Sequence, residues 1–369
     1  MTPASYPHTK DCPLVSIVAL CYNHDAFVEE ALDSILAQTY PNIELIIIDD
    51  ASADKSVSII NNWIGKNNPA CNFIVHKNNQ GTCKTLNESL KLVNGKYFQG
   101  FACDDIMMPT KIEEQVRFLE NNTDYIAVCS NAEVVDKNSK TIKKQHFNDD
   151  FVFPEPGKVF DAVLNGHKGY WSVVHSPTVL LRKDVFDVVG YYPEDILQED
   201  FYMWLKISAL YKIGYYPHIT IKYRQHEKSM SQNPQFTDRI HVDILKVCKL
   251  FLDEFPQKEN QIILVQKRRL NYFLQKVLHN KLSVEKYINY VTMFTNRTVA
   301  CELLSNGDID RPLLDLFLLD KKKCLELIDS NKIKIQNKLY KTLISGYMPV
   351  WIPKILITTK RFIFKRDEE

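Results

Sequence analysis

The chain has 369 residues, of which 45% are hydrophobic and 11% aromatic, and its 46 basic side chains nearly balance 45 acidic ones. This composition excludes a disordered, collagen-like or coiled-coil chain, and the formal net charge of +1 argues against a protein that coats nucleic acid. The nine Cys occur singly with no CxxC pair, so we expect no disulfide framework, no zinc site and a reducing compartment. The first residues lack a basic stretch followed by an apolar one, so we expect no secretory signal there.

Two kinds of apolar segment alternate along the first half of the chain. Short strand-like runs occupy residues 15–20, 45–48, 72–75, 97–101, 126–129 and 178–181. Apolar side chains recur at helical spacing over residues 27–36, where Asp25 is the expected N-cap, over residues 82–93 and after Pro109. This alternation predicts an α/β fold with a mostly parallel sheet flanked by helices.

Polar side chains follow three of these strands directly. The first strand runs into Tyr22-Asn23, the second into Asp49-Asp50 and the fourth into Asp104-Asp105. Ligands of open α/β sheets bind at the carboxyl ends of strands, and paired carboxylates suit a hard divalent cation. The alternative is that these residues only form turns and helix caps. A dinucleotide site is disfavoured because no GxGxxG follows the first strand.

The segment 15–52, VSIVALCYNHDAFVEEALDSILAQTYPNIELIIIDDAS, resembles the opening of family 2 glycosyltransferases. The resemblance continues through Asn79-Gln80-Gly81, Asp104-Asp105 and Glu199-Asp200. It implies the GT-A fold, a Rossmann-like fold of nucleotide-diphospho-sugar transferases. We expect a catalytic domain over residues 1–235 and a mainly α-helical C-terminal region over residues 236–369.

The resemblance implies a nucleotide-sugar site at the tips of the first two strands. Leu20, Tyr22, Asn23 and Asp50 are expected to hold the nucleotide. A carboxylate that accepts a hydrogen bond from a uracil N–H would select uridine over cytidine. Lys84 is expected to reach the nucleotide, with an exposed helix lysine as the alternative; Tyr22 could instead be a core aromatic.

The Asp104-Asp105 pair occupies the position of the family's metal-binding DXD motif, although Ala102 stands where an Asp is often found. The resemblance implies that one carboxylate binds Mn²⁺ or Mg²⁺ and the other holds the ribose or donor sugar. Asp104 and Asp105 are both candidates for the metal, and Asp104 is also a candidate for the sugar. His226 is expected near the metal and the diphosphate. The alternatives are an acidic helix cap for the pair and a surface histidine for His226.

Asp200 is the candidate general base, because a sugar hydroxyl attacks poorly unless its proton is removed. Glu199 is expected to support Asp200 or to touch the acceptor, and the same two acids could simply favour a helix N-terminus. Trp171 and His175 are candidates for acceptor binding, since an aromatic ring can stack on a sugar. Either side chain could equally belong to the core.

The C-terminal third is predicted to be helical, with apolar spacing over residues 240–251 and 262–278. Residues 332–366 contain no Asp or Glu, whereas basic and aromatic side chains alternate there. This tail suits an anionic membrane surface, and the alternative is a basic helix packed on its own domain. Its apolar stretch, 343–357, is too short to span a bilayer.

The resemblance implies a metal-dependent, inverting glycosyltransferase of the hexosyltransferase type. It would move a sugar from a UDP-sugar to a glycan or lipid-linked saccharide in the biosynthesis of bacterial surface polysaccharide such as O-antigen or capsule. We expect a cytoplasmic enzyme, peripheral on the inner face of the plasma membrane, without a nucleic acid partner. The alternatives are a nucleotidyltransferase and a non-catalytic assembly subunit with the GT-A fold.

Overall fold

The computed structural model describes residues 12–168, 170, 172–227 and 237–278, together with residues 286, 290, 293 and 294. The chain divides into two compact units, Met1–Val247 and Cys248–Glu369. The strands are β1 (Val15–Cys21), β2 (Ile43–Asp49), β3 (Cys71–Val75), β4 (Tyr97–Ala102), β5 (Ile106–Met107), β6 (Tyr125–Val135), β7 (Thr141–Lys143), β8 (Leu180–Arg182) and β9 (Lys212–Arg224).

The helices of the described residues include those predicted and several that were not. They are α1 (Val28–Leu36), α2 (Ser56–Asn67), α3 (Thr82–Leu90), α4 (Lys111–Asn121), α5 (Val159–Asn165), the short η1 (Ser176–Thr178), α6 (Val185–Val189), α7 (Glu199–Leu210), α8 (Thr237–Glu254), the short η4 (Pro256–Lys258) and α9 (Glu259–Leu278). The prediction of Asp25 as a cap is wrong: α1 begins at Val28, and the Asp25 backbone N–H instead donates to Asp54 at 3.0 Å.

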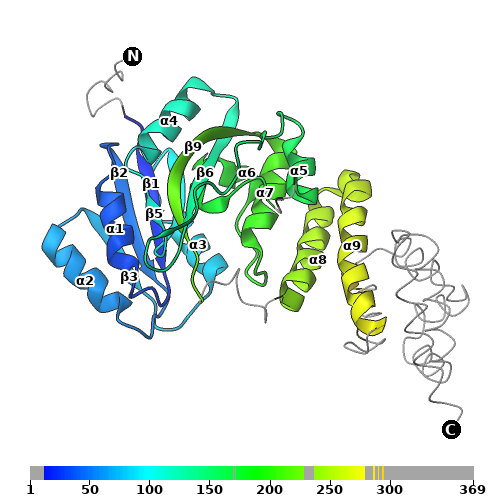
Figure 1. Cartoon of the computed structure of the whole chain (residues 1–369), viewed down its shortest axis with the longest axis horizontal. Coiled ribbons are helices and arrows are strands. Elements are labelled where there is room, and N and C mark those ends of the chain that lie inside the picture. The colour runs from blue at the N-terminus through cyan, green and yellow to red at the C-terminus, as the bar shows by residue number, and fades with distance from the viewer. Residues whose placement is uncertain are drawn as a thin grey trace, which may run out of the picture. The chain divides into compact units, whose positions relative to one another are not determined.

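One sheet of nine strands forms the centre of the first unit (Figure 1). The strand order is β3-β2-β1-β4-β8-β6-β9-β5, with β7 paired to β6. The pairs from β3 through β4 are parallel, and so are β6 and β9. Strand β8 is antiparallel to both β4 and β6, and β5 is antiparallel to β9. The predicted α/β class, with a mostly parallel sheet between helices, is confirmed, and β9 is an addition that the sequence reasoning missed.

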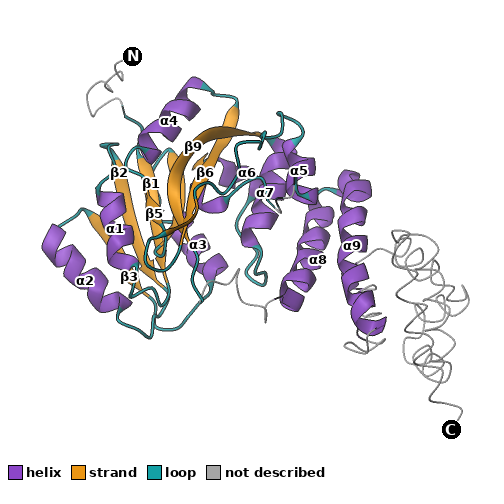
Figure 2. Cartoon of the chain, viewed as in Figure 1, coloured by secondary structure: helices purple, strands orange, loops and turns teal. Residues whose placement is uncertain are grey.

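Helices pack on both faces of this sheet, as Figure 2 shows. Ile17 and Ala19 of β1 pack in one core with α1, α2 and α4, through residues such as Leu32. On β4, Phe98 packs edge-to-face on Phe186 of α6, with 5.5 Å between ring centroids. Because successive side chains of a strand point to opposite faces, apolar residues must follow one another in β1, and this is why it reads as a continuous apolar run.

A buried lysine ties η1 to the sheet. Lys111 of α4 has no exposed surface, and its Nζ donates to the side-chain oxygens of Gln115, at 2.6 Å, and of Gln99. The Gln115 amide donates in turn to the carbonyl oxygen of Thr178 at 2.6 Å. Burial lowers the pKa of Lys111 well below its ordinary value. These bonds fix the segment that carries Ser176.

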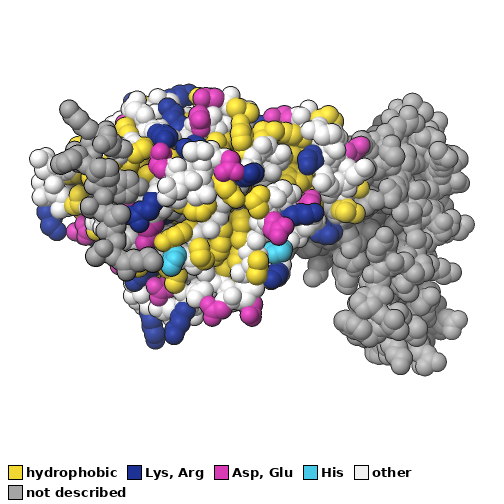
Figure 3. Space-filling view, turned by 90° about the horizontal axis from the view of Figure 1, so that it is seen from above, with side chains coloured by type: hydrophobic (Ala, Val, Ile, Leu, Met, Phe, Trp, Pro, Cys, Tyr) yellow, Lys and Arg dark blue, Asp and Glu magenta, His cyan; other side chains and the backbone are white. Residues whose placement is uncertain are grey.

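In the second unit, α9 buries Ile262, Val265 and Leu270, and the Gln266 amide donates to the carbonyl oxygen of Phe294 at 2.6 Å. No helix among the described residues is both long and apolar enough to cross a membrane. The basic tail lies outside the described residues, as do residues 228–236, so the boundary at residue 235 stays a prediction. On the face shown in Figure 3, acidic and basic side chains are interspersed with hydrophobic ones.

Candidate active site

Three neighbouring strands end side by side at one edge of the sheet. The Asp50 N–H donates to the Cys21 carbonyl oxygen at 2.9 Å, and the Cys103 N–H donates to the Leu20 carbonyl oxygen at 2.9 Å. These bonds continue the parallel pairing of β1 with β2 and with β4 by one residue each. The chain segments that carry the predicted nucleotide and metal residues therefore leave the sheet as direct neighbours.

The tip of β1 presents an exposed aromatic ring. Tyr22 is 47% exposed, which is high for so large a hydrophobic side chain, so it is not the core aromatic of the alternative. Asn23 follows with a left-handed φ of 58°, which asparagine tolerates better than most residues. Its N–H donates to Ser52 Oγ and its Oδ1 accepts from the Ala53 N–H, both at 2.8 Å. Asn23 thus joins the β1 and β2 tips, and Tyr22 stays free to meet a ligand.

The two acids after β2 have different tasks. Asp49 is fully buried and accepts from the Ser52 N–H at 2.8 Å and the Ser52 hydroxyl at 2.7 Å, which closes the turn. Asp50 accepts from the backbone N–H groups of Gln80 and Gly81, each at 2.8 Å, just before α3. Asp50 therefore anchors the loop between β3 and α3.

Asp104 and His226, both predicted at the metal, lie together. Their Oδ2 and Nε2 atoms are 3.1 Å apart, and His24 Nε2 lies 3.9 Å from the same oxygen. Burial opposes ionisation of Asp104, but the His226 hydrogen bond and the two imidazoles outweigh it and lower the pKa of Asp104. His24, which follows Asn23 directly at the β1 tip, was missed by the sequence reasoning.

Asp105 points away from this group. Its Oδ1 accepts from the backbone N–H of Arg224 at 2.8 Å, and only 2% of the residue is exposed. Burial, and then the charge of Asp104, raise the pKa of Asp105 well above its ordinary value. Arg224 is also buried: its guanidinium donates to the Asp104 carbonyl oxygen at 2.7 Å and to Glu30 at 2.6 Å. This geometry argues against a metal contact from Asp105 and against a phosphate contact from Arg224.

Asp200 lies at the start of α7 in a small hydrogen-bonded group. Its Oδ2 accepts from the Ser176 hydroxyl at 3.0 Å and its Oδ1 from the Phe201 N–H at 2.6 Å. The indole N–H of Trp204 donates to Ser176 Oγ at 2.8 Å, so the hydroxyl hydrogen of Ser176 is directed to Asp200. Burial raises the pKa of Asp200, which makes it a stronger base than an ordinary carboxylate.

Glu199 lies beside Asp200, and burial, followed by the charge of Asp200, raises the pKa of Glu199 to about 8. The turn that leads into these acids is held by Asp243 of α8, which accepts from the Leu197 N–H at 2.6 Å and the Gln198 N–H at 2.7 Å. Two carboxyls with raised pKa values at the start of one helix are typical of a site of proton transfer.

The remaining predicted residues have other neighbours. Lys84 is solvent-facing on α3, with its Nζ 3.7 Å from Glu194. His175 stacks on His146, with ring centroids 4.3 Å apart and an interplanar angle of 10°, and its Nδ1 has no hydrogen-bond partner among the described residues. Burial, and then His146, lower the pKa of His175 well below its ordinary value. Trp171 lies outside the described residues.

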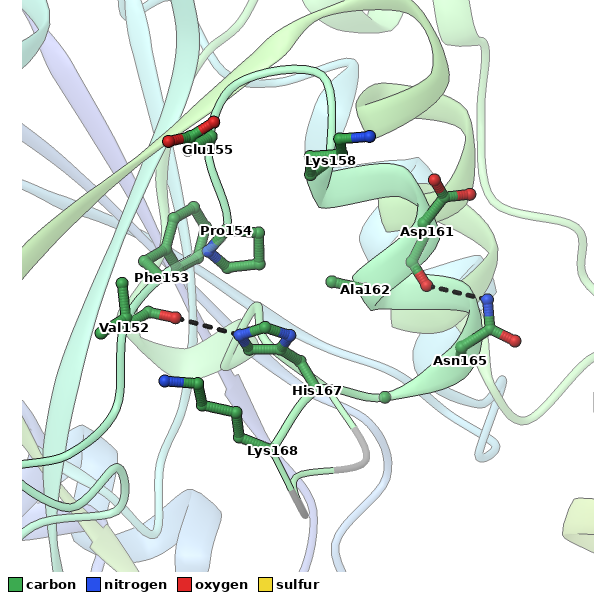
Figure 4. A pocket seen from close by; sticks show the side chains of 11 residues that line it. Val152, Phe153, Pro154, Glu155, Lys158, Asp161, Ala162, Asn165, His167 and Lys168 are labelled. Atoms are coloured by element: carbon green, nitrogen blue, oxygen red, sulfur yellow. Dashed lines mark hydrogen bonds between the residues drawn. The ribbon is translucent and has the colours of Figure 1, made fainter.

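An open pocket of about 570 Å³ lies between the start of α5 and the chain on either side of it (Figure 4). Its walls combine apolar side chains with charged and amide groups: Val152, Phe153, Pro154, Glu155, Lys158, Asp161, Ala162, Asn165, Gly166, His167 and Lys168. His167 Nε2 is 3.1 Å from the Val152 carbonyl oxygen, which fixes the ring at one end of the pocket. Helix α5 packs against α7, the helix that carries Asp200.

Comparison with known sequences identifies the family. The profile described as Glycosyl transferase family 2 matches residues 16–190. An uncharacterized glycosyltransferase of Haemophilus influenzae is 31% identical over 228 residues, which cover 60% of this chain and 68% of that protein. One of Rickettsia typhi is 32% identical over 219 residues, covering 58% of this chain and 65% of that protein. The chain belongs to glycosyltransferase family 2 and is a glycosyltransferase.

Solved structures agree on the fold. S. aureus TarS 1–349, in complex with UDP-GlcNAc, superposes with a TM-score of 0.58 at 16% identity, covering 87% of this chain and 92% of the TarS 1–349 chain. The mannosyltransferase PcManGT from Pyrobaculum calidifontis, in complex with GDP-Man and Mn²⁺, gives a TM-score of 0.50 at 15% identity and covers 90% of this chain and 87% of that one. The predicted GT-A fold is confirmed.

Proposed function

We propose that this chain is a metal-dependent, inverting glycosyltransferase that uses a UDP-sugar. Its acceptor would be a glycan or lipid-linked saccharide in the assembly of a bacterial surface polysaccharide. The observation that carries the proposal is the junction of the three strand ends, from which Tyr22, Asp50 and Asp104 leave as neighbours. One nucleoside diphosphate would contact all three.

The nucleotide half of the site rests on Tyr22 and Asp50. The exposed Tyr22 ring offers an apolar face for the base, with Leu20 and Asn23 beside it on the same strand tip. Asp50 would accept from the ring N–H of uracil, a donor that cytosine lacks. TarS, which shares the fold, was solved with UDP-GlcNAc, and this supports the choice of a UDP-sugar.

The group formed by Asp104 and His226 fits a divalent cation such as Mn²⁺ or Mg²⁺. A carboxylate oxygen and an imidazole nitrogen already lie 3.1 Å apart, and the oxygens of a diphosphate would supply further ligands. Among the described residues there is no set of three or more His, Cys, Asp or Glu side chains arranged to hold an ion. In this proposal the donor diphosphate supplies the other ligands. The cation would stabilise the charge of the leaving diphosphate.

Asp200 would remove the proton of the acceptor hydroxyl as the hydroxyl attacks the anomeric carbon. Glu199 and His175 would line the acceptor side, together with Trp171, which the structure leaves undescribed. The open pocket near α5 mixes apolar walls with charged and amide groups, a lining that suits the hydroxyls and C–H faces of further acceptor sugars.

The proposal is tested with a panel of UDP-, GDP- and CDP-sugars in the presence of Mn²⁺ or Mg²⁺, by following nucleoside diphosphate release without acceptor. Slow hydrolysis of one UDP-sugar, dependent on the cation, is expected. Pyrophosphate release from a nucleoside triphosphate would instead favour a nucleotidyltransferase. Binding of nucleotide sugar without any turnover, with or without saccharide acceptors, would favour a non-catalytic subunit.

Replacing Ser176 with alanine is expected to shift the pH dependence of transfer. The Ser176 hydrogen bond lowers the pKa of Asp200 against the effect of burial, so its loss raises that pKa further. The base must be deprotonated, and the acidic limb of kcat/KM should therefore move to higher pH by up to about one unit. Ser208→Ala is the control, since that hydroxyl donates only to backbone carbonyls of α7. If the acidic limb of the kcat/KM profile did not move in Ser176→Ala, Asp200 would not be the group that accepts the proton.

The basic tail is proposed to hold the protein on the inner face of the plasma membrane. We expect the triple variant Lys360→Gln, Arg361→Gln, Lys365→Gln to bind vesicles containing phosphatidylglycerol roughly a hundredfold more weakly, at about 1 kcal/mol per charge. Co-sedimentation measures this, and the matched control neutralises Lys91, Lys137 and Lys140, which are exposed in the first unit. Equal losses in both variants would leave the tail without a specific part in binding.

A further inference from the structure

His76 lies directly after β3, between two carboxylates. Its Nδ1 is 2.7 Å from Asp50 Oδ1, and its Nε2 is 2.9 Å from Glu88 Oε2 on α3. The His76 side chain is only 6% exposed, and that of Asp50 is 9% exposed. The His76 imidazole therefore joins the ends of β2 and β3 to α3, and it contacts Asp50, the residue predicted to bind the base.

Both of these bonds require an N–H on the ring, because an ionised carboxylate only accepts hydrogen bonds. A neutral imidazole has one N–H and can satisfy one carboxylate, whereas the protonated ring satisfies both. Burial opposes the charged ring, but the bonds to Asp50 and Glu88 outweigh it and raise the pKa of His76. An acceptor oxygen at each ring nitrogen favours the protonated ring and fixes its plane at both ends.

The hydrogen bonds of Asp50 can be counted. A carboxylate has about four acceptor positions, two on each oxygen. His76 and the Gln80 N–H fill those of Oδ1, and the Gly81 N–H fills one on Oδ2. One position, on Oδ2, is left for a ligand. Three donors on its two oxygens hold the carboxylate in one orientation, in which it presents an acceptor to a ligand.

We propose that His76, supported by Glu88, is the positioning residue for base selection: it locks Asp50 as an obligate acceptor, so that the site takes a base with a ring N–H, namely uracil, and rejects cytosine. This inference rests on the proposed function and adds the residues that make the base contact selective. Cytosine would bring a ring nitrogen lone pair against the Asp50 lone pair, which is repulsive.

The experiment measures the dissociation constants of UDP and CDP by calorimetry in Mn²⁺, for the full chain and its variants. We expect His76→Ala to weaken UDP binding about tenfold and to leave CDP binding unchanged, so that the UDP preference falls by the same factor. His76→Gln keeps a side chain of similar length with one donor group, so an intermediate loss is expected, and it serves if the alanine variant does not fold. His218→Ala, which removes an exposed histidine of β9, is the matched control and should behave as the native chain.

The possible results distinguish a failure of the inference about His76 from a failure of the proposed use of UDP. A loss confined to UDP supports the inference. Equal weakening of UDP and CDP binding means that His76 only maintains the fold. Unchanged affinities for both nucleotides mean that Asp50 does not depend on His76. Either result overturns the inference and leaves the proposed function intact. A native chain that binds neither nucleotide overturns the proposed use of UDP and the inference with it.

Discussion

Asp200→Asn is expected to lower kcat for sugar transfer by a factor of about 10² to 10⁴, with the affinity for the donor nucleotide unchanged. Asparagine keeps an oxygen that can accept from the Phe201 N–H, so the start of α7 should be preserved. What it cannot do is take a proton from the acceptor hydroxyl. The measurement is steady-state transfer alongside calorimetric binding of UDP.

Asp195→Asn provides the control for this experiment. Asp195 lies in the same connection before α7, but its carboxylate is exposed and faces Lys246 at 3.7 Å. We expect near-native kcat from this variant. If Asp200→Asn also kept native kcat, proton removal would have to occur elsewhere. If the native chain itself showed no turnover, the result would favour the alternative of a non-catalytic assembly subunit.

Asp104→Asn is expected to abolish the strengthening of UDP binding by Mn²⁺ and to reduce transfer by at least about a hundredfold. The carboxylate oxygen that faces His226 at 3.1 Å is the one that a cation would share with the imidazole. An amide is a much weaker ligand for a hard cation than a carboxylate is. Titration of Mn²⁺ into the UDP complex provides the measurement.

Asp105→Asn is the matched variant one residue away. Its amide oxygen can still accept from the Arg224 N–H, so folding should be largely preserved. We expect the Mn²⁺ dependence of UDP binding to survive in this variant. If the Mn²⁺ dependence of UDP binding were lost in Asp105→Asn and kept in Asp104→Asn, then Asp105 and not Asp104 would be the ligand of the cation.

Much of the sheet could be predicted because its strands are buried on both faces. In β1 and β2 most positions face a core and are apolar, with Ser16 an exception, so the runs 15–20 and 45–48 can be recognised as strands without a known partner. Strand β9 escaped because it contains Pro217 and several polar residues, and its register against β6 shifts at bulges. Such a strand is defined by the neighbour it pairs with and not by a local pattern.

Only the site residues that lie within recognisable sequence motifs could be predicted. Asp104 and His226, far apart in the chain, were both expected at the metal, and they lie together. The contacts that give side chains their roles were not visible: His76 gains its role from Asp50, 26 residues earlier, and Ser176 gains its role from Asp200, 24 residues later. No spacing rule encodes these pairings, because they arise from how the strands and helices pack.

The bond from Arg224 to Asp105 has a consequence for how the chain is made. It links residues separated by 119 positions, and Arg224 also donates to the Asp104 carbonyl oxygen. During synthesis on the ribosome, β1 to β4 emerge long before β9, so the acidic pair leaves the exit tunnel without the segment that orients it. A nascent chain that stops short of β9 would contain Tyr22 and Asp50 but lack His226, so the proposed cation site could form only after β9 has been made.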